Sequence, residues 1–227
     1  MVMLGLKSVR MQHVIIIIFI LTAHFSMSQD NKVIKYLALG DSYTIGESVS
    51  EAERWPNQLA KALNEKGYEV EKPRIIATTG WRTDNLKNAM TIAQLKPEYN
   101  MVSLLIGVNN QYQHKPVDQF AKEFEGLLND AVQLAGGKKE NVFVVSIPDY
   151  GYTPFGKPKQ DEISKALKEF NEISKQITEK HKITYINITD ISFQGLEKPE
   201  LVAGDGLHPS GKMYTLWVER ILAGLKK

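Results

Sequence analysis

The sequence of 227 residues contains no cysteine. Disulfide bonds, a thiol nucleophile, thiolate metal sites and a lipid anchor on an N-terminal cysteine are therefore excluded. Three further patterns are absent from it: the Gly-x-Ser-x-Gly turn, the His-Glu-x-x-His zinc motif and the Gly-x-Gly-x-x-Gly dinucleotide loop. These absences remove nucleophile-elbow hydrolases, zincins and common dinucleotide-binding domains from consideration.

The chain also lacks a large excess of charge. It has 28 basic and 26 acidic residues, a formal net charge of +2. The first 28 residues hold Lys7 and Arg10 but no acidic residue, so the remainder has 26 basic and 26 acidic residues. No charge imbalance points to nucleic acid or an anionic membrane surface as a partner.

Residues 1–28 have the layout of a secretory signal peptide. Two basic residues precede the apolar run 14–21, which is short for a membrane span. Ser26 and Ser28 supply the small residues expected before a cleavage site. We expect cleavage after Ser28, a secreted or periplasmic mature chain 29–227, and no stable membrane insertion after cleavage. An uncleaved membrane anchor is the alternative interpretation.

After the signal, short apolar runs alternate with amphipathic segments, with no repeat and no linker. The predicted strands are rich in β-branched and apolar residues and cover 33–39, 74–78, 101–106, 141–147 and 183–188. The predicted helices show apolar residues at helical spacing within 51–66, 84–95, 117–131, 163–177 and 213–221. This alternation predicts one α/β domain over 29–227, a three-layer α/β/α sandwich with a five-stranded parallel sheet of flavodoxin-like order.

Residues that can do chemistry gather where the predicted strands end. The first strand runs into Gly40-Asp41-Ser42, the second ends at Gly80, and the third ends at Gly107-Val-Asn109. The loop after the fifth strand leads to Asp205-Gly-Leu-His208. Because these ends share one edge of a parallel sheet, the side chains can converge there. On its own, Gly-Asp-Ser is also the pattern of a helix-capping turn.

The residue types at this edge suit acyl transfer. Serine is a weak nucleophile until a base takes its proton, and His208 is the candidate base for Ser42. Asp205 can orient the imidazole, while the amides of Ser42 and Gly80 and the Asn109 side chain can form an oxyanion hole. Activity is then expected to rise as His208 loses its proton, near or somewhat above neutrality.

These motifs make the chain resemble the SGNH hydrolases, also called the GDSL esterase/lipase family. The four signature residues are matched, in family order, by Ser42 in Gly-Asp-Ser-Tyr, Gly80, Asn109 in Gly-Val-Asn-Asn, and His208 in Asp-Gly-Leu-His-Pro. The likeness covers about residues 30–225. It implies a flavodoxin-like fold, ester hydrolysis through a seryl intermediate, and neither metal nor cofactor.

The substrate is less determined than the chemistry. Tyr43 stands where the family name has Leu, and Asn110 stands where many members have Asp. Both differences are expected to reshape the pocket or its hydrogen bonds. The expected substrate is a lipase- or lysophospholipase-like small-molecule or lipid ester, and an acetylated polysaccharide is the alternative. A non-catalytic binding module on the same fold is the alternative from another class.

Several loop residues are candidates for substrate contact or, equally, for loop packing. These residues are Trp81, Arg82, Tyr150, Tyr152 and Phe155. His114 follows the Asn109 loop and is interpreted as a surface or substrate-contact residue. Asp41 is expected to order its turn rather than orient the imidazole, because adjacent side chains on an extended backbone diverge.

Overall fold

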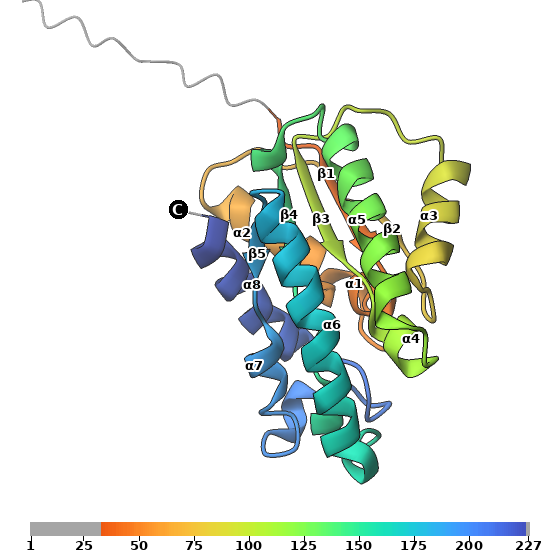
Figure 1. The fold of residues 1–227 in the computed structure, drawn as a ribbon. Helices are drawn as coiled ribbons and strands as arrows, with labels where there is room; N and C mark the ends of the chain where they lie inside the picture. Colours follow the sequence, from red (N-terminus) through yellow and green to blue (C-terminus); the bar gives the residue numbers. More distant parts are fainter. Residues whose placement is uncertain (1–32, 226–227) are drawn as a thin grey trace, which may run out of the picture. The chain divides into compact units, whose positions relative to one another are not determined.

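The computed structural model describes residues 33–225, so the predicted signal segment 1–28 lies outside the described residues. Within them, five parallel strands form one sheet in the order β2-β1-β3-β4-β5 (Figure 1). The strands are β1 (Tyr36–Gly40), β2 (Arg74–Ala77), β3 (Met101–Leu105), β4 (Val142–Val145) and β5 (Thr184–Ile186). This flavodoxin-like order confirms the predicted fold class.

The burial of the strands follows from their place in the sheet. Every residue of the central strands β1, β3 and β4 is buried. Parallel strands covered on both faces read as continuous apolar runs, as Val-Phe-Val-Val of β4 does. The edge strands β2 and β5 are short and partly exposed.

Helices cover both faces of the sheet. Each buries an apolar stripe, and the five long ones are α2 (Trp55–Glu65), α3 (Thr83–Ile92), α5 (Val117–Leu134), α6 (Gln160–Lys180) and α8 (Gly211–Leu225). Helices α3, α5 and α6 lie side by side over one face, while α2 and α8 pack together on the other (Figure 1). No helix within residues 33–225 has both the length and the apolar character needed to span a bilayer.

The structure contains short helices that the sequence pattern does not reveal. They are α1 (Ser42–Ile45), α4 (Val108–Tyr112) and α7 (Thr189–Ser192), and none is long enough to show a helical period. The 3₁₀ turns are η1 (Glu51–Glu53), η2 (Lys139–Asn141), η3 (Tyr150–Tyr152), η4 (Lys157–Lys159) and η5 (Pro199–Leu201). The helix expected over 51–66 is thus divided, because η1 ends before Pro56 occupies the first turn of α2.

Candidate active site

A cavity of about 300 Å³ opens where β1, β2 and β3 end. Strands β2 and β3 flank β1, so this edge is the point at which the chain order of the sheet reverses, where open α/β sheets bind ligands. Ser42, Gly80, Asn109 and His208 line this one cavity. The other lining residues are Tyr43, Thr79, Val108, Tyr112, Tyr150, Phe155 and Leu207.

Ser42 is held just after the carboxyl end of β1 by a capped turn. Asp41 caps α1, and its Oδ1 accepts a hydrogen bond from the Tyr43 amide at 3.0 Å. Ser42 itself is only 5% exposed, yet it lines the cavity. Among the hydrogen bonds of residues 33–225, none uses the Ser42 hydroxyl, so this group is available to a ligand.

His208 and Asp205 form a close pair. The His208 Nδ1 atom lies 2.6 Å from Asp205 Oδ2, and the His208 amide donates to Asp205 Oδ1 at 2.9 Å. Partial burial alone would raise the pKa of Asp205, but hydrogen bonds from Ser48, His208 and Leu207 outweigh it and hold that pKa well below its usual range. An ionised Asp205 only accepts, so Nδ1 carries the proton and the lone pair of His208 is at Nε2.

Ser48 is a neighbour of this pair that sequence reasoning missed. Its Oγ donates to Asp205 Oδ2 at 2.6 Å across 157 positions of sequence. Tyr43 also touches the pair, since its ring meets the His208 ring edge-on with centroids 5.8 Å apart. No residue pattern marks Ser48, because an exposed turn serine is common and its partner is remote in the chain.

Ser42 and Gly80 both line the cavity and can offer their backbone amides to a ligand. Gly80 has φ +84°, a backbone conformation that favours glycine, although nothing lies within 4 Å of the position of a Cβ there. Within residues 33–225, no hydrogen bond uses the N–H of Ser42 or of Gly80. Asn109 Nδ2 donates to the Trp81 carbonyl at 3.0 Å, which orients the carboxamide and leaves its second N–H. Three donors can therefore meet an anionic oxygen.

Asn110 braces the segment that carries Gly80. The side chain is buried, its Oδ1 accepts from the Thr83 amide at 3.1 Å, and its Nδ2 donates to Thr83 Oγ1 at 2.7 Å. Thr83 Oγ1 in turn donates to Glu123. A carboxamide serves both as donor and as acceptor here. The Asn at this position therefore ties the start of α3 to α4.

Three aromatic rings form one wall of the cavity. Tyr150 is buried and its hydroxyl donates to Gln111 Oε1 at 3.0 Å. Tyr112 and Phe155, 53% and 51% exposed, lie 6.2 and 6.4 Å from the Tyr150 ring between centroids. The same three rings border a second compartment of about 270 Å³, which His114 also lines.

The structure places three other candidate contacts away from the cavity lining. The Trp81 side chain packs against the hydrophobic core, and Arg82 pairs with Asp84 at 2.8 Å. Tyr152 packs on Phe193, with ring centroids 4.6 Å apart, in a different depression beside α6. Of the five loop residues singled out from the sequence, Tyr150 and Phe155 line the cavity of Ser42.

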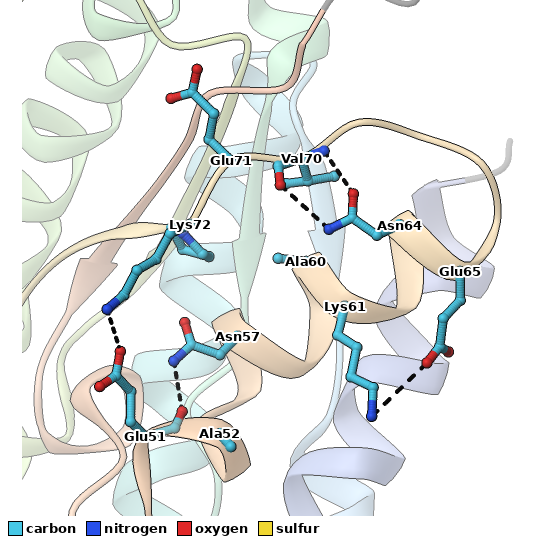
Figure 2. Close-up of a pocket in the computed structure, with 11 residues that line it drawn as sticks. Glu51, Ala52, Asn57, Ala60, Lys61, Asn64, Glu65, Val70, Glu71 and Lys72 are labelled. Atoms are coloured by element: carbon cyan, nitrogen blue, oxygen red, sulfur yellow. Dashed lines mark hydrogen bonds and ion pairs between the residues drawn. The ribbon is translucent and has the colours of Figure 1, made fainter.

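A larger depression of about 730 Å³ lies between α2 and the segment before β2 (Figure 2). Several of its polar side chains already have partners: Lys72 pairs with Glu51 at 2.6 Å, and Asn64 is hydrogen-bonded to the backbone of Val70. It holds no serine and no histidine, so it lacks a nucleophile–base pair. Within residues 33–225, no three His, Cys, Asp or Glu side chains are grouped to hold a metal ion.

Comparison with known proteins gives one family and many similar folds. Residues 38–216 match the model of the GDSL-like lipase/acylhydrolase family. No curated protein sequence matches the chain.

Three of the similar solved structures illustrate the likeness of the fold. A lipase/acylhydrolase from Enterococcus faecalis is 20% identical, with a TM-score of 0.66 over 85% of this chain and 95% of its own. A psychrotrophic esterase from Pseudoalteromonas sp. is 19% identical (TM-score 0.61, 86% and 96% covered). An acetylxylan esterase from Geobacillus stearothermophilus is 17% identical (TM-score 0.63, 86% and 94% covered). At these identities the likeness is one of fold.

Proposed function

Because the chain belongs to the GDSL-like lipase/acylhydrolase family, we propose that it hydrolyses carboxylic esters through a covalent seryl intermediate. One observation carries the proposal. Ser42, an Asp-paired histidine and two residues whose backbone amides have no acceptor within residues 33–225 line a single cavity of about 300 Å³. Those are the groups that acyl transfer requires.

In the acylation step, His208 Nε2 takes the proton of Ser42 as Oγ attacks the ester carbonyl carbon. The carbonyl oxygen becomes an oxyanion between the Ser42 and Gly80 amides and the Asn109 carboxamide. The C–O bond to the alcohol then breaks, and His208 gives its proton to the leaving oxygen. Asp205 stays ionised and stabilises the imidazolium. A hydrogen bond between a catalytic nucleophile and its base, here Ser42 Oγ and His208 Nε2, often forms only when substrate is bound.

In the deacylation step, His208 takes a proton from water, which attacks the acyl carbon. The same oxyanion donors serve again, and collapse of the second intermediate releases the acid. His208 returns the proton to Ser42 Oγ, so the enzyme is regenerated with no group consumed.

The cavity dimensions favour esters of short acids. A volume of about 300 Å³ is at the lower end for ligand pockets, and Tyr150 and Phe155 close one side of it. The second compartment beyond these rings adds polar side chains, His114, Lys159 and Glu162. An acetyl ester of a polar alcohol such as a glycan fits this division, with a longer lipid ester as the alternative.

We also propose that the chain is exported by the predicted signal segment 1–28 and acts as the mature form 29–227. The basic start, the short apolar run and the small residues before the cleavage site support this.

Activity on a series of nitrophenyl esters, from acetyl to long-chain, tests the function. Wild-type protein is expected to hydrolyse the short esters best and to react covalently with a fluorophosphonate. The Ser42→Ala variant should lose essentially all hydrolysis, by a factor of about 10⁴ or more, and all labelling. The Ser50→Ala variant is the matched control, since Ser50 is an exposed serine bonded to Glu53.

Two results would count against parts of the proposal. Retained hydrolysis by Ser42→Ala would overturn the assignment of the nucleophile. A wild-type chain that neither hydrolyses esters nor labels would support the binding-module alternative. Preference for long acyl chains would favour a lipid ester, whereas release of acetate from acetylated oligosaccharide would favour the glycan.

A further inference from the structure

Asp205 accepts four hydrogen bonds, and one of them comes from a distant segment. Its Oδ1 accepts from the backbone N–H groups of Leu207 and His208, both at 2.9 Å. Its Oδ2 lies 2.6 Å from His208 Nδ1 and 2.6 Å from Ser48 Oγ. The first three partners belong to the loop of Asp205 itself. Among residues 33–225, Ser48 alone ties the carboxylate to another part of the fold.

That other part is the segment of the nucleophile. Ser48 follows Ser42 by six positions, directly after α1 and its αL cap at Gly46. The hydrogen bond from Ser48 therefore joins the turn that holds the hydroxyl to the loop that holds the imidazole. Because Ser42 begins α1 and His208 lies in a loop remote from it in the chain, their mutual distance depends on such a link.

The backbone of Ser48 is unusual as well. Its φ is +65°, in the left-handed region that non-glycine residues adopt only with backbone strain. Serine has no special preference for this conformation, whereas glycine adopts it readily. The hydroxyl and its partner supply a reason for a serine at a position where glycine would relieve the backbone.

We propose that Ser48 is a positioning residue of the reaction, which holds the Asp205 carboxylate, and through it the His208 ring, in register with Ser42. This inference rests on the proposed function. Ser48 is not among the residues that line the cavity, and its hydroxyl acts through Asp205. Since it shares Oδ2 with the imidazole, it also limits how much negative charge that oxygen presents to His208.

Loss of the hydroxyl has two expected consequences. The Asp205–His208 pair loses its hydrogen bond to the segment of Ser42, so kcat should fall while KM stays unchanged. The expected fall is about tenfold, which matches the contribution of one hydrogen bond to a charged group. The carboxylate oxygen then serves the imidazole alone and stabilises its protonated form more strongly. The acid limb of the pH–kcat/KM profile should therefore move to higher pH.

Three variants separate the hydrogen bond from the backbone. Ser48→Ala removes the hydroxyl and keeps the strained φ. Ser48→Gly removes the hydroxyl and relieves the strain, so it should unfold at an equal or higher denaturant concentration than wild type. Ser50→Ala removes a neighbouring hydroxyl that bonds Glu53 instead. Asp41, Glu47 and Arg54 are the charged residues that act, together with Asp205, on the buried Tyr214. None of the three is changed in any of these variants, so they do not account for a difference between the pH profiles.

We expect both Ser48 variants to have a lower kcat and an acid limb of the pH–kcat/KM profile that lies at higher pH. Ser50→Ala should behave as wild type. Full activity in Ser48→Gly would assign the role to the backbone and overturn the inference. An unmoved pH profile in both Ser48 variants would reduce Ser48 to a structural residue and would overturn it too.

A measurement without substrate keeps this test separate from the proposed function. The Nδ1 proton of His208, bonded at 2.6 Å to a carboxylate, should give a far-downfield proton NMR signal. We expect that signal to move in Ser48→Ala and Ser48→Gly but not in Ser50→Ala. An unmoved signal would refute the inference even in a protein without esterase activity, whereas a moved signal in such a protein would leave only the proposed function refuted.

Discussion

Two carboxyl groups stand beside the proposed nucleophile and base in opposite environments. Asp41 is fully buried, one of its oxygens has no hydrogen-bond partner within the described chain, and burial raises its pKa to about 7. Asp205 is saturated with donors, and its pKa is held low. Paired acids whose surroundings separate their pKa values take different roles. Asp205 is the ionised partner of the imidazole, and Asp41 is the cap of α1.

Asp41 should make the stability of the protein depend on pH. Its pKa is about 7 in the folded state and about 3.9 in an unfolded chain. Between these values the folded state binds more protons, so the contribution of Asp41 is fully present below about pH 4 and is lost as pH rises to about 7. We expect the free energy of unfolding of Asp41→Asn to rise relative to that of wild type over this range, by about a few kcal/mol.

Urea unfolding of both proteins at several pH values measures this gain. Asp190→Asn serves as a control, because the hydrogen bond from Arg220 lowers the pKa of that exposed carboxyl, and its stabilising effect is lost only at acid pH. Parallel curves for Asp41→Asn and wild type from pH 4 to 7 would show that the buried carboxyl does not titrate there.

At the scale of elements, the close packing of α1 on β1 places Ser42. A Cβ at Gly40 would lie 2.1 Å from Thr44 Oγ1 and 2.5 Å from the Leu105 carbonyl oxygen. Only a residue without a side chain lets α1 fold back over the end of β1 at this distance. Gly126 is the opposite case, since it lies within α5 and nothing is within 4 Å of its Cβ position.

The same substitution should therefore act with opposite signs at these two glycines. Gly40→Ala is expected to destabilise the fold by about 1–3 kcal/mol through overpacking, and to lower kcat because α1 must shift. Gly126→Ala should stabilise it by about 0.5–1 kcal/mol, since glycine is a poor residue for a helix interior. Denaturant midpoints and kcat for both variants test this, and a neutral Gly40→Ala would contradict the packing argument.

At the scale of the whole molecule, the described residues 33–225 belong to one compact unit. Their hydrophobic core runs through both faces of the sheet and includes Trp55 on one face and Phe120 on the other. The predicted signal segment holds the two basic residues that give the full chain its net charge of +2. Its removal would leave a catalytic unit with no formal net charge.

The export proposal predicts the composition of the mature protein. In an exporting bacterial host, the full chain should yield a product that begins at Gln29, as intact-mass measurement would show. A chain made directly as residues 29–227 should have the same kcat, because the described cavity lies wholly beyond residue 33. A product that keeps residues 1–28 in the membrane fraction would favour the uncleaved anchor instead.

The sequence by itself determined the fold class and predicted the chemistry that we propose for the sheet edge. Buried parallel strands read as apolar runs, and because the strands are parallel, all of their carboxyl ends lie on one edge of the sheet. Ser42, Gly80 and Asn109 follow three such ends, so their meeting in one cavity needed no knowledge of side-chain contacts. Asp205 and His208 are three residues apart, a spacing that a single turn can bring together.

Only the tertiary structure decided which other side chains surround that chemistry. Tyr150 and Tyr152 are two residues apart, yet one lines the cavity and the other packs on Phe193 behind it. Ser48 reaches Asp205 across 157 positions, through a left-handed turn that no local pattern specifies. Contacts between loops depend on how the two loops are packed, which is a property of the folded chain, whereas the periodicity of a strand or helix is local and is written in the sequence.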